Sequence, residues 1–127
     1  MPPIARNIDY NFEFKTGILT KHHIGEIIIS DIIDSWEWAF KTELIPKGTK
    51  MFLLDYREAI VHDTLRSSES IVKFYHNNID QFRDSKFAIV SENPKNIALS
   101  MLVQKQDSNY QTRPFSTIEK AIDWLIE

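Results

Sequence analysis

A chain of 127 residues with 43% hydrophobic and 26% charged side chains has the composition of an ordinary globular protein, and its length suits one domain. The net charge is −3 and both signs are scattered, so the sequence offers no basic patch for the phosphates of a nucleic acid. Cysteine is absent and no apolar run approaches the length of a bilayer span, which excludes thiol catalysis, Cys-based zinc sites, a disulfide-built secreted scaffold and a membrane-spanning helix.

The N-terminal part of the chain is predicted to contain an arm followed by a β-hairpin. Residues 1–6 hold no signal-peptide core, so we expect a flexible arm, a cytoplasmic location and a single domain over residues 7–127. From Ile8 to Lys15 the polarity alternates, which predicts a half-buried strand whose core face holds Ile8, Tyr10, Phe12 and Phe14. Thr16-Gly17 is a turn signal, so residues 18–24 should return antiparallel before Gly25 lets the chain leave the sheet.

The next segment is predicted to place a helix before the central strand. Ser30 or Asp31 can cap a helix that runs to about Leu44, with a buried stripe of Ile33, Trp36, Phe40 and Leu44. The run from Met51 to Asp55 is then apolar up to its final carboxylate. Because this run has no polar face, it is typical of a strand covered by helices on both sides, and residues 57–63 should form a loop after it.

The C-terminal half is predicted to continue the alternation of helices and strands. Asp63 or Thr64 should open a second helix that reaches about Phe82, and residues 87–90 should form a second buried strand. Asn93-Pro94 starts a third helix, which turns inward the side chains of Ile97, Ala98, Met101 and Leu102.

Residues 109–115 include Pro114, which suits an edge strand. Ser116 and Glu119 form a capping box for a last helix that buries Ile118, Ala121, Ile122 and Leu125. The order β-β-α-β-α-β-α-β-α therefore predicts an α/β fold in which helices pack on a mixed sheet of four or five strands.

Several short strings in this order resemble the SpoIIAA-like branch of the STAS fold, which is grouped with Sec14-type domains. They are Gly25-Glu26-Ile27, Lys47-Gly48, Leu54-Asp55-Tyr56-Arg57, Phe87-Ala88-Ile89-Val90, and Phe115-Ser116-Thr117 leading into Ala121-Ile122-Asp123-Trp124-Leu125. The likeness covers nearly the whole chain. It implies a four- or five-stranded sheet backed by helices and no known enzyme activity. Members of the wider fold act as anti-sigma-factor antagonists, as transporter tails, or as binders of lipids and nucleotides.

The antagonists of that family carry a phosphorylatable Ser at the start of the second helix, in an Asp-Ser-Ser-Gly or Asp-Ser-Thr-Gly string. The matching stretch here is Asp63-Thr64-Leu65-Arg66, so the usual acceptor position falls on Leu65 and the Gly position on Arg66. This departure argues against the family's phospho-switch. Hydroxyls at a helix start still favour a bound or covalent phosphate, with ordinary capping as the alternative. If the stretch is a switch, we expect Thr64 or Ser67 to be the acceptor.

Asp55 ends the central strand, and open α/β sheets tend to bind ligands beyond such strand ends. We expect a binding edge for a partner or an anion, lined by Asp55, Tyr56, Arg57, Asp63, Thr64, Arg66 and Ser67. The alternative is that Asp55 only accepts local backbone N–H bonds. Neither the histidines nor the glycines have the spacing of a metal site, a nucleophile elbow or a phosphate loop, so we expect no catalytic residue, metal or cofactor.

Trp38 and Phe74 lie off the buried stripes of the first and second helices, which predicts an exposed aromatic patch. Such a patch would serve a protein partner, a homodimer or lipid entry; packing against a neighbouring helix is the alternative. Our first hypothesis is a non-enzymatic regulatory or protein-interaction module of the STAS type. The second is a small lipid or apolar-ligand binding protein of the Sec14-like type. An enzyme ranks last, because no nucleophile–base or paired-acid arrangement is present.

Overall fold

The computed structural model describes residues 7–62, 68–106 and 109–127, with the side chains of Ser68 and residues 102–106 excepted. The expected flexible arm at residues 1–6 lies outside this description. The strands are β1 (Ile8–Glu13), β2 (Ile18–Ile27), β3 (Met51–Val61), β4 (Lys86–Val90) and β5 (Gln111–Phe115). They form one five-stranded sheet in the order β1-β2-β3-β4-β5, with β1 antiparallel to β2 and the other neighbours parallel. The predicted mixed sheet and the edge position of β5 are confirmed.

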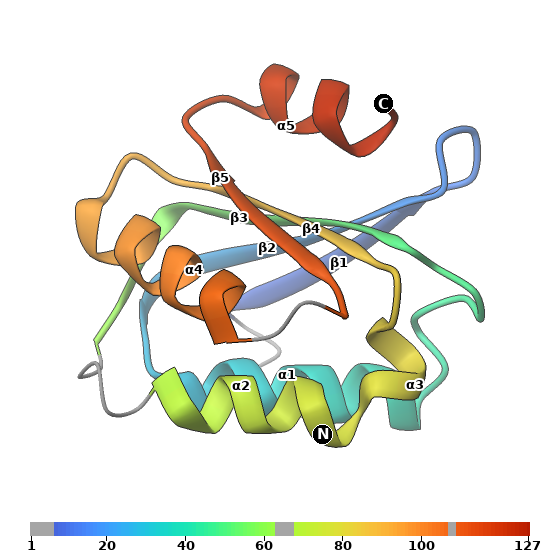
Figure 1. The fold of residues 1–127 in the computed structure, drawn as a ribbon, viewed down its shortest axis with the longest axis horizontal. Coiled ribbons are helices and arrows are strands. Elements are labelled where there is room, and N and C mark those ends of the chain that lie inside the picture. The colour runs from blue at the N-terminus through green and yellow to red at the C-terminus, as the bar shows by residue number, and fades with distance from the viewer. Residues whose placement is uncertain (1–6, 63–67, 107–108) are drawn as a thin grey trace.

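Helices cover the two faces of the sheet unequally (Figure 1). One face carries α1 (Ile29–Lys41), α2 (Ser68–Asn77), α3 (Ile79–Phe82) and α4 (Pro94–Gln106). The other face carries α5 (Ile118–Leu125), which packs on β3, β4 and β5. In the described part of the chain, the second face therefore has no helix over β1 and most of β2; the start of β2, at Ile18, packs with α5.

The larger core lies between the sheet and the helices α1 to α4, and its centre is aromatic. Trp36 is fully buried, and its ring meets Phe52 and Phe82 edge-on at centroid distances of 5.5 and 5.3 Å. On the opposite side of β3, Leu53 packs with Ala121 and Leu125 of α5 in a smaller core. Burying a side chain of this size stabilises the fold by roughly 1.5–3 kcal/mol. The prediction that the run from Met51 is covered on both faces is confirmed.

Strands β2 and β3 continue further than the alternation suggested, because a β-bulge joins two paired stretches. His22 pairs with Asp55, but the next paired residues are Ile24 and Glu58, so β3 holds one extra residue. The pairing then runs on to Ile27 and Val61. The expected loop over residues 57–63 is thus wrong for its first part, as is the exit from the sheet at Gly25. A bulge resets the two-residue period, and a broken period resembles the end of a strand.

The ends of the first two helices differ from the prediction. The first helix begins at Ile29, where the Asp31 carboxylate accepts the Ile28 N–H at 3.0 Å, and it ends at Lys41, which leaves Leu44 exposed. The predicted second helix is divided at Asn78. The backbone N–H of Asn78 still makes the helical bond to the Phe74 carbonyl at 3.1 Å, and the Asn78 side-chain N–H donates to the same carbonyl at 2.9 Å.

The later helices begin near the predicted residues but bury other side chains. The Asn93 cap is confirmed, because its Oδ1 accepts the Lys95 N–H at 2.9 Å. The inward face of α4 holds Asn96 and Ser100, whereas Met101 and Ala98 are exposed; the side chain of Leu102 lies outside the description. The cap of α5 is Thr117 and not Ser116: Thr117 Oγ1 accepts the Lys120 N–H at 3.3 Å. That helix also buries Trp124, which the predicted stripe omitted.

Beyond β1, Phe14 leaves the predicted core face. The strand ends at Glu13, and Phe14 is 87% exposed, with its ring edge-on to Phe12 at 5.0 Å. Tyr10 and Phe12 pack against the larger core as predicted.

Candidate functional site

The uncovered half of the second sheet face holds the candidate site, and we call it the open face. It consists of the side chains of β1, β2 and β3 that point away from α1. By strand register, and apart from Ile18, Met51 and Leu53, which pack with α5, these are Asp9, Asn11, Glu13, Thr20, His22, Ile24, Glu26, Asp55, Glu58 and Ile60, with Arg57 from the bulge.

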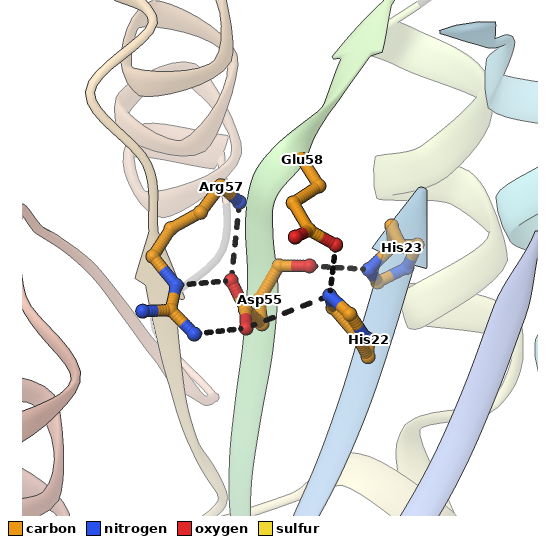
Figure 2. A network of polar contacts seen from close by, with 5 residues as sticks. All are labelled: His22, His23, Asp55, Arg57 and Glu58. Atoms are coloured by element: carbon orange, nitrogen blue, oxygen red, sulfur yellow. Dashed lines mark hydrogen bonds and ion pairs between the residues drawn. The ribbon is translucent and has the colours of Figure 1, made fainter. Parts of the chain in front are cut away.

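The bulge builds a network of polar contacts around Asp55 (Figure 2). Asp55 is 4% exposed, and its Oδ1 accepts the backbone N–H of Arg57 at 3.1 Å and the Nε–H at 3.0 Å. Its Oδ2 accepts an Nη2–H of the same guanidinium at 2.9 Å. The extra residue of the bulge thus turns Arg57 back onto Asp55, and a two-point contact fixes the plane of the guanidinium.

The two charges of this pair reinforce each other. Burial raises the pKa of Asp55, but the hydrogen bonds and charge of Arg57, with a contribution from His22, outweigh burial and hold the pKa below its ordinary value. The hydrogen bond to Asp55 in turn raises the pKa of Arg57. A carboxylate with a lowered pKa is a weak base, so Asp55 is suited to hold Arg57 rather than to take a proton from a substrate.

Two histidines on the open face each lie beside a glutamate of the neighbouring strand. His22 Nε2 is 3.2 Å from Glu58 Oε2 and 3.9 Å from Asp55 Oδ2. His62, just beyond β3, places Nε2 at 3.0 Å from Glu26 Oε1. Both pairs join β2 to β3, one at the bulge and one at the far end of the strands. The sequence did not single out Glu58 or Glu26, because cross-strand partners are set by register rather than by local spacing.

Two grooves flank Arg57 along α5. The first, of about 260 Å³, runs between α5 and strands β1 to β3, with Glu13, Thr20, Leu53 and Ile118 among its lining residues. The second, of about 360 Å³, lies at the start of α5 and is lined by Arg57, Glu92 and residues 116–119. Arg57 and Ile118 line both grooves, so the guanidinium held by Asp55 stands at their junction.

The core side of the same strands holds polar groups that no ligand can reach directly. His23 is fully buried, stacks on Tyr56 at 4.0 Å and donates from Nδ1 to the Asp55 carbonyl at 3.2 Å. Lys21 is also fully buried, with Nζ 4.0 Å from the centre of the Trp36 ring. Burial lowers the pKa of both Lys21 and His23 well below the ordinary values. His22 and His23 therefore point to opposite faces of the sheet, as successive residues of a strand do.

A small apolar cavity lies between the sheet and the helices α1, α2 and α4. Tyr56, Ile71, Tyr75 and Leu99 contribute to its lining, and the space open to a water centre is about 40 Å³. A water needs roughly 10–15 Å³ on this measure, so the cavity holds about three waters. Sites for drug-sized ligands are of the order of 300 Å³ or more.

The predicted site residues fall into three groups. Asp55 and Arg57 lie together on the open face, whereas Tyr56 is buried on the core side, so its placement at the binding edge is wrong. Successive residues of a strand face opposite ways, which separates Tyr56 from Asp55. The predicted residues Asp63, Thr64, Arg66 and Ser67 lie outside the described part of the chain.

The predicted exposed aromatic patch is not present on the two helices. Phe74 is 7% exposed and packs with Phe82 at 6.1 Å in the larger core. Trp38 is half-buried, with its ring 6.4 Å from that of Tyr10. Both residues instead pack against neighbouring elements, which was the alternative expectation. Phe74 does so because α2 packs against other helices, including α1, and Trp38 does so because β1 lies beside α1.

The described residues form neither a metal-binding cluster nor a membrane-spanning helix. Within residues 7–62, 68–106 and 109–127, no cluster of at least three His, Asp or Glu side chains is placed to hold a metal ion. None of the helices in this described part combines the length and apolar character that crossing a bilayer requires.

Comparison with known proteins identifies the fold. The sequence matches no protein-family model and no curated protein. The structure is similar to the crystal structure of an uncharacterized protein of the DUF3478 family, with a SpoIIAA-like fold, from Shewanella loihica PV-4. The TM-score is 0.62 at 16% sequence identity, and the match covers 93% of this chain and 91% of that chain. The chain therefore has a SpoIIAA-like α/β fold, as the resemblance predicted; at this identity the likeness shows the fold alone.

Proposed function

We propose that this chain is a non-enzymatic regulatory or protein-interaction module that binds its partner through the open face. The observation that carries the proposal is the unequal covering of the sheet. The face toward α1 is covered by helices, whereas on the other face β1 and most of β2 have no helix over them in the described residues, since α5 reaches β2 only at its start, at Ile18. An extended surface that is built rigidly and left uncovered is suited to docking another protein.

The side chains on this surface suit binding more than chemistry. The Asp55 carboxylate is occupied by Arg57, and His22 lies against Glu58, so these ionisable groups bond to one another. Ile24 and Ile60 are 38% and 41% exposed near this network. Exposed apolar residues beside well-ordered polar ones are the composition of a transient protein interface.

A small lipid or apolar-ligand carrier is the second candidate, and the cavity disfavours it. Its apolar lining of Ile71, Tyr75 and Leu99 fits such a ligand, but about 40 Å³ accommodates only a few water molecules. Native mass spectrometry of freshly purified protein separates the two candidates. A bare polypeptide mass agrees with the interaction module, and a co-purifying lipid would favour the carrier.

Site-specific photo-crosslinking tests the interaction role. A photoreactive residue is placed at Asn11 or Thr20 on the open face and, as a control, at Glu37 on the outer side of α1. The full-length chain is expressed in its native cells and irradiated, and adducts are identified by mass spectrometry. We expect a defined protein adduct from the open-face positions that the control position does not give. Labelling that is absent, or equal from both sides of the molecule, would remove the proposal.

A further inference from the structure

The open face carries acidic side chains on each of its strands. Asp9 and Glu13 project from β1, Glu26 from β2 and Glu58 from β3, and all are exposed. Among the described residues of β1, β2 and β3, the one Lys or Arg side chain on this face is Arg57, which is already paired with Asp55. Strands β1 and β2 contain one lysine, Lys21, and its side chain is buried on the core side.

Apolar side chains mark both ends of the same surface. At one end the groove beside α5 contains Ile18, Leu53, Ile118 and Ile122. At the other end Ile24 and Ile60 are exposed on neighbouring strands, each opposite a glutamate of the other strand. Ile18 and Ile24 lie on one strand, so about 20 Å separates the two apolar ends at 3.3 Å per residue.

We propose that the open face receives a basic amphipathic segment of a partner protein. Its Lys or Arg side chains would meet Glu13, Glu26 and Glu58, and its apolar side chains would cover the groove and the exposed Ile pair. This inference rests on the proposed interaction role and adds the chemistry of the partner. A helix of about 14 residues spans the 20 Å at 1.5 Å per residue.

Charge complementarity selects this occupant over the others. A second copy of the chain that presented the same face would bring Glu13, Glu26 and Glu58 against like charges, which opposes association. Nucleic acids and anionic membranes are repelled by the same carboxylates. A cationic segment is the partner that gains from each of them.

Binding of designed peptides tests the inference directly. The probe is a fluorescein-labelled peptide of about 14 residues made of Lys and Leu, with Leu spaced to form one face of a helix and Lys the other. The control peptide carries Glu in place of Lys. Fluorescence anisotropy with the full chain gives both affinities at about 50 mM and about 200 mM salt. The Lys/Leu peptide should bind, more weakly at high salt, and the Glu/Leu peptide should not. Chemical shifts of the amides in β1 to β3 should move on binding, and those of α1 should not.

Two matched variants separate the open face from overall net charge. Glu13→Gln/Glu26→Gln/Glu58→Gln removes carboxylates of the open face. Asp34→Asn/Glu37→Gln/Glu43→Gln removes the same amount of charge from α1 and the turn after it, and all the replaced residues are exposed. We expect the first to weaken the Lys/Leu peptide about tenfold, since exposed charge pairs each change an affinity by a small factor, and the second by less than about twofold. Circular dichroism melting verifies that both are folded, and Glu13→Gln alone serves if the triple is not.

The outcomes are distinguishable from those of the proposed function. Equal weakening by both triples would show that net charge alone attracts the peptide, and no weakening would place the contact elsewhere; either result overturns the inference. So would binding of the Glu/Leu peptide or of phosphatidylserine vesicles, or a dimer that the open-face triple abolishes. A different result is a partner that is crosslinked from Thr20 and also binds the open-face triple variant as tightly as the original chain. That result would support the proposed interaction role and would contradict the proposal of a basic segment.

Discussion

His22 and Asp55 face each other on neighbouring parallel strands, and the next pair along the ladder is Ile24 with Glu58. The extra residue on β3 allows Asp55, Arg57 and Glu58 to lie on one side of the sheet, where strict alternation would have sent Glu58 to the core. The bulge therefore creates the polar network, and without it the open face would lack the contact between His22 and Glu58.

Removing the guanidinium should cost stability, because it leaves a buried carboxylate without its charged partner. We expect Arg57→Ala to lower the free energy of unfolding by about 1–2 kcal/mol, near the value for a hydrogen bond to a charged group and discounted for the exposure of Arg57. Urea denaturation measures the loss. Arg57→Lys keeps the charge but not the two-point contact, so its loss of stability should lie between zero and that of Arg57→Ala. Lys41→Ala, on the exposed end of α1, is the control. A loss no greater than that of the control would contradict the strength assigned to this pair.

Acid should weaken the fold in part through Asp55. Its pKa is lowered in the folded chain, so its contribution is fully present above the pKa of the unfolded state and is lost as the pH falls through the folded value. Asp55→Asn should therefore reduce stability at pH 7 and have a smaller effect near pH 3. Urea midpoints across this pH range, compared with those of Asp34→Asn, measure the difference. A variant whose curve runs parallel to that of the original chain would refute the expectation.

The buried strands could be predicted because burial on both sides leaves an unbroken apolar run. This holds for Phe52 to Leu54 and for Phe87 to Val90, which lie where the sequence placed them. The continuation of β3 past Asp55 could not be predicted, because the bulge at Arg57 interrupts the period on which such a prediction depends. The continuation of β3 depends on its pairing with β2, and this pairing joins residues that are far apart in the sequence.

The candidate site could likewise be predicted only in part. Asp55 and Arg57 follow from the rule that strand ends bind, but His22 and Glu58 join them only through register. Burial of Lys21 depends on Trp36, from a helix that follows in the chain, so no local pattern indicates it. Phe74 was expected on the surface because it lies off the buried stripe of its helix. It is buried because that helix also packs against neighbouring helices, which a single amphipathic stripe does not represent.

Truncating two phenylalanines should separate core from surface. Phe74→Ala removes a ring from the larger core and should cost about 3–5 kcal/mol, whereas Phe14→Ala, at an 87% exposed position, should change stability by less than about 0.5 kcal/mol. Thermal melting followed by circular dichroism compares them. Similar melting temperatures for the two variants would contradict the placement of Phe74 in the core.

The last helix offers a test of which hydroxyl caps it. Thr117 Oγ1 accepts the Lys120 N–H, and Thr117→Ala should therefore cost about 1 kcal/mol. Ser116→Ala, one residue earlier, removes an exposed hydroxyl and should have little effect. Chemical denaturation of both variants gives the comparison. The reverse order of losses would restore Ser116 as the cap that the capping-box pattern predicted.

Lys21 should reduce the stability of the fold near neutral pH. Burial lowers its pKa, so between its folded and unfolded values the unfolded chain binds more protons, and stability rises with pH. Lys21→Met keeps the length of the side chain and its packing on Trp36 and removes the buried amine. We expect Lys21→Met to raise the free energy of unfolding at pH 7 by about 1 kcal/mol or more, within the range found when buried charges are replaced by apolar groups.

The gain from Lys21→Met should shrink toward pH 10, where the unfolded amine also loses its proton. Urea denaturation at pH 6 to 10 measures both effects, and Lys41→Met on the exposed end of α1 is the control. His23 has a lowered pKa as well, but its ordinary value is near 6.5, so its influence is confined to the acid side of this range. A Lys21→Met variant that is less stable than the original chain at pH 7 would show that the contact of Nζ with the Trp36 ring and its hydrogen bond to the Ile32 carbonyl, at 3.4 Å, outweigh the cost of burial.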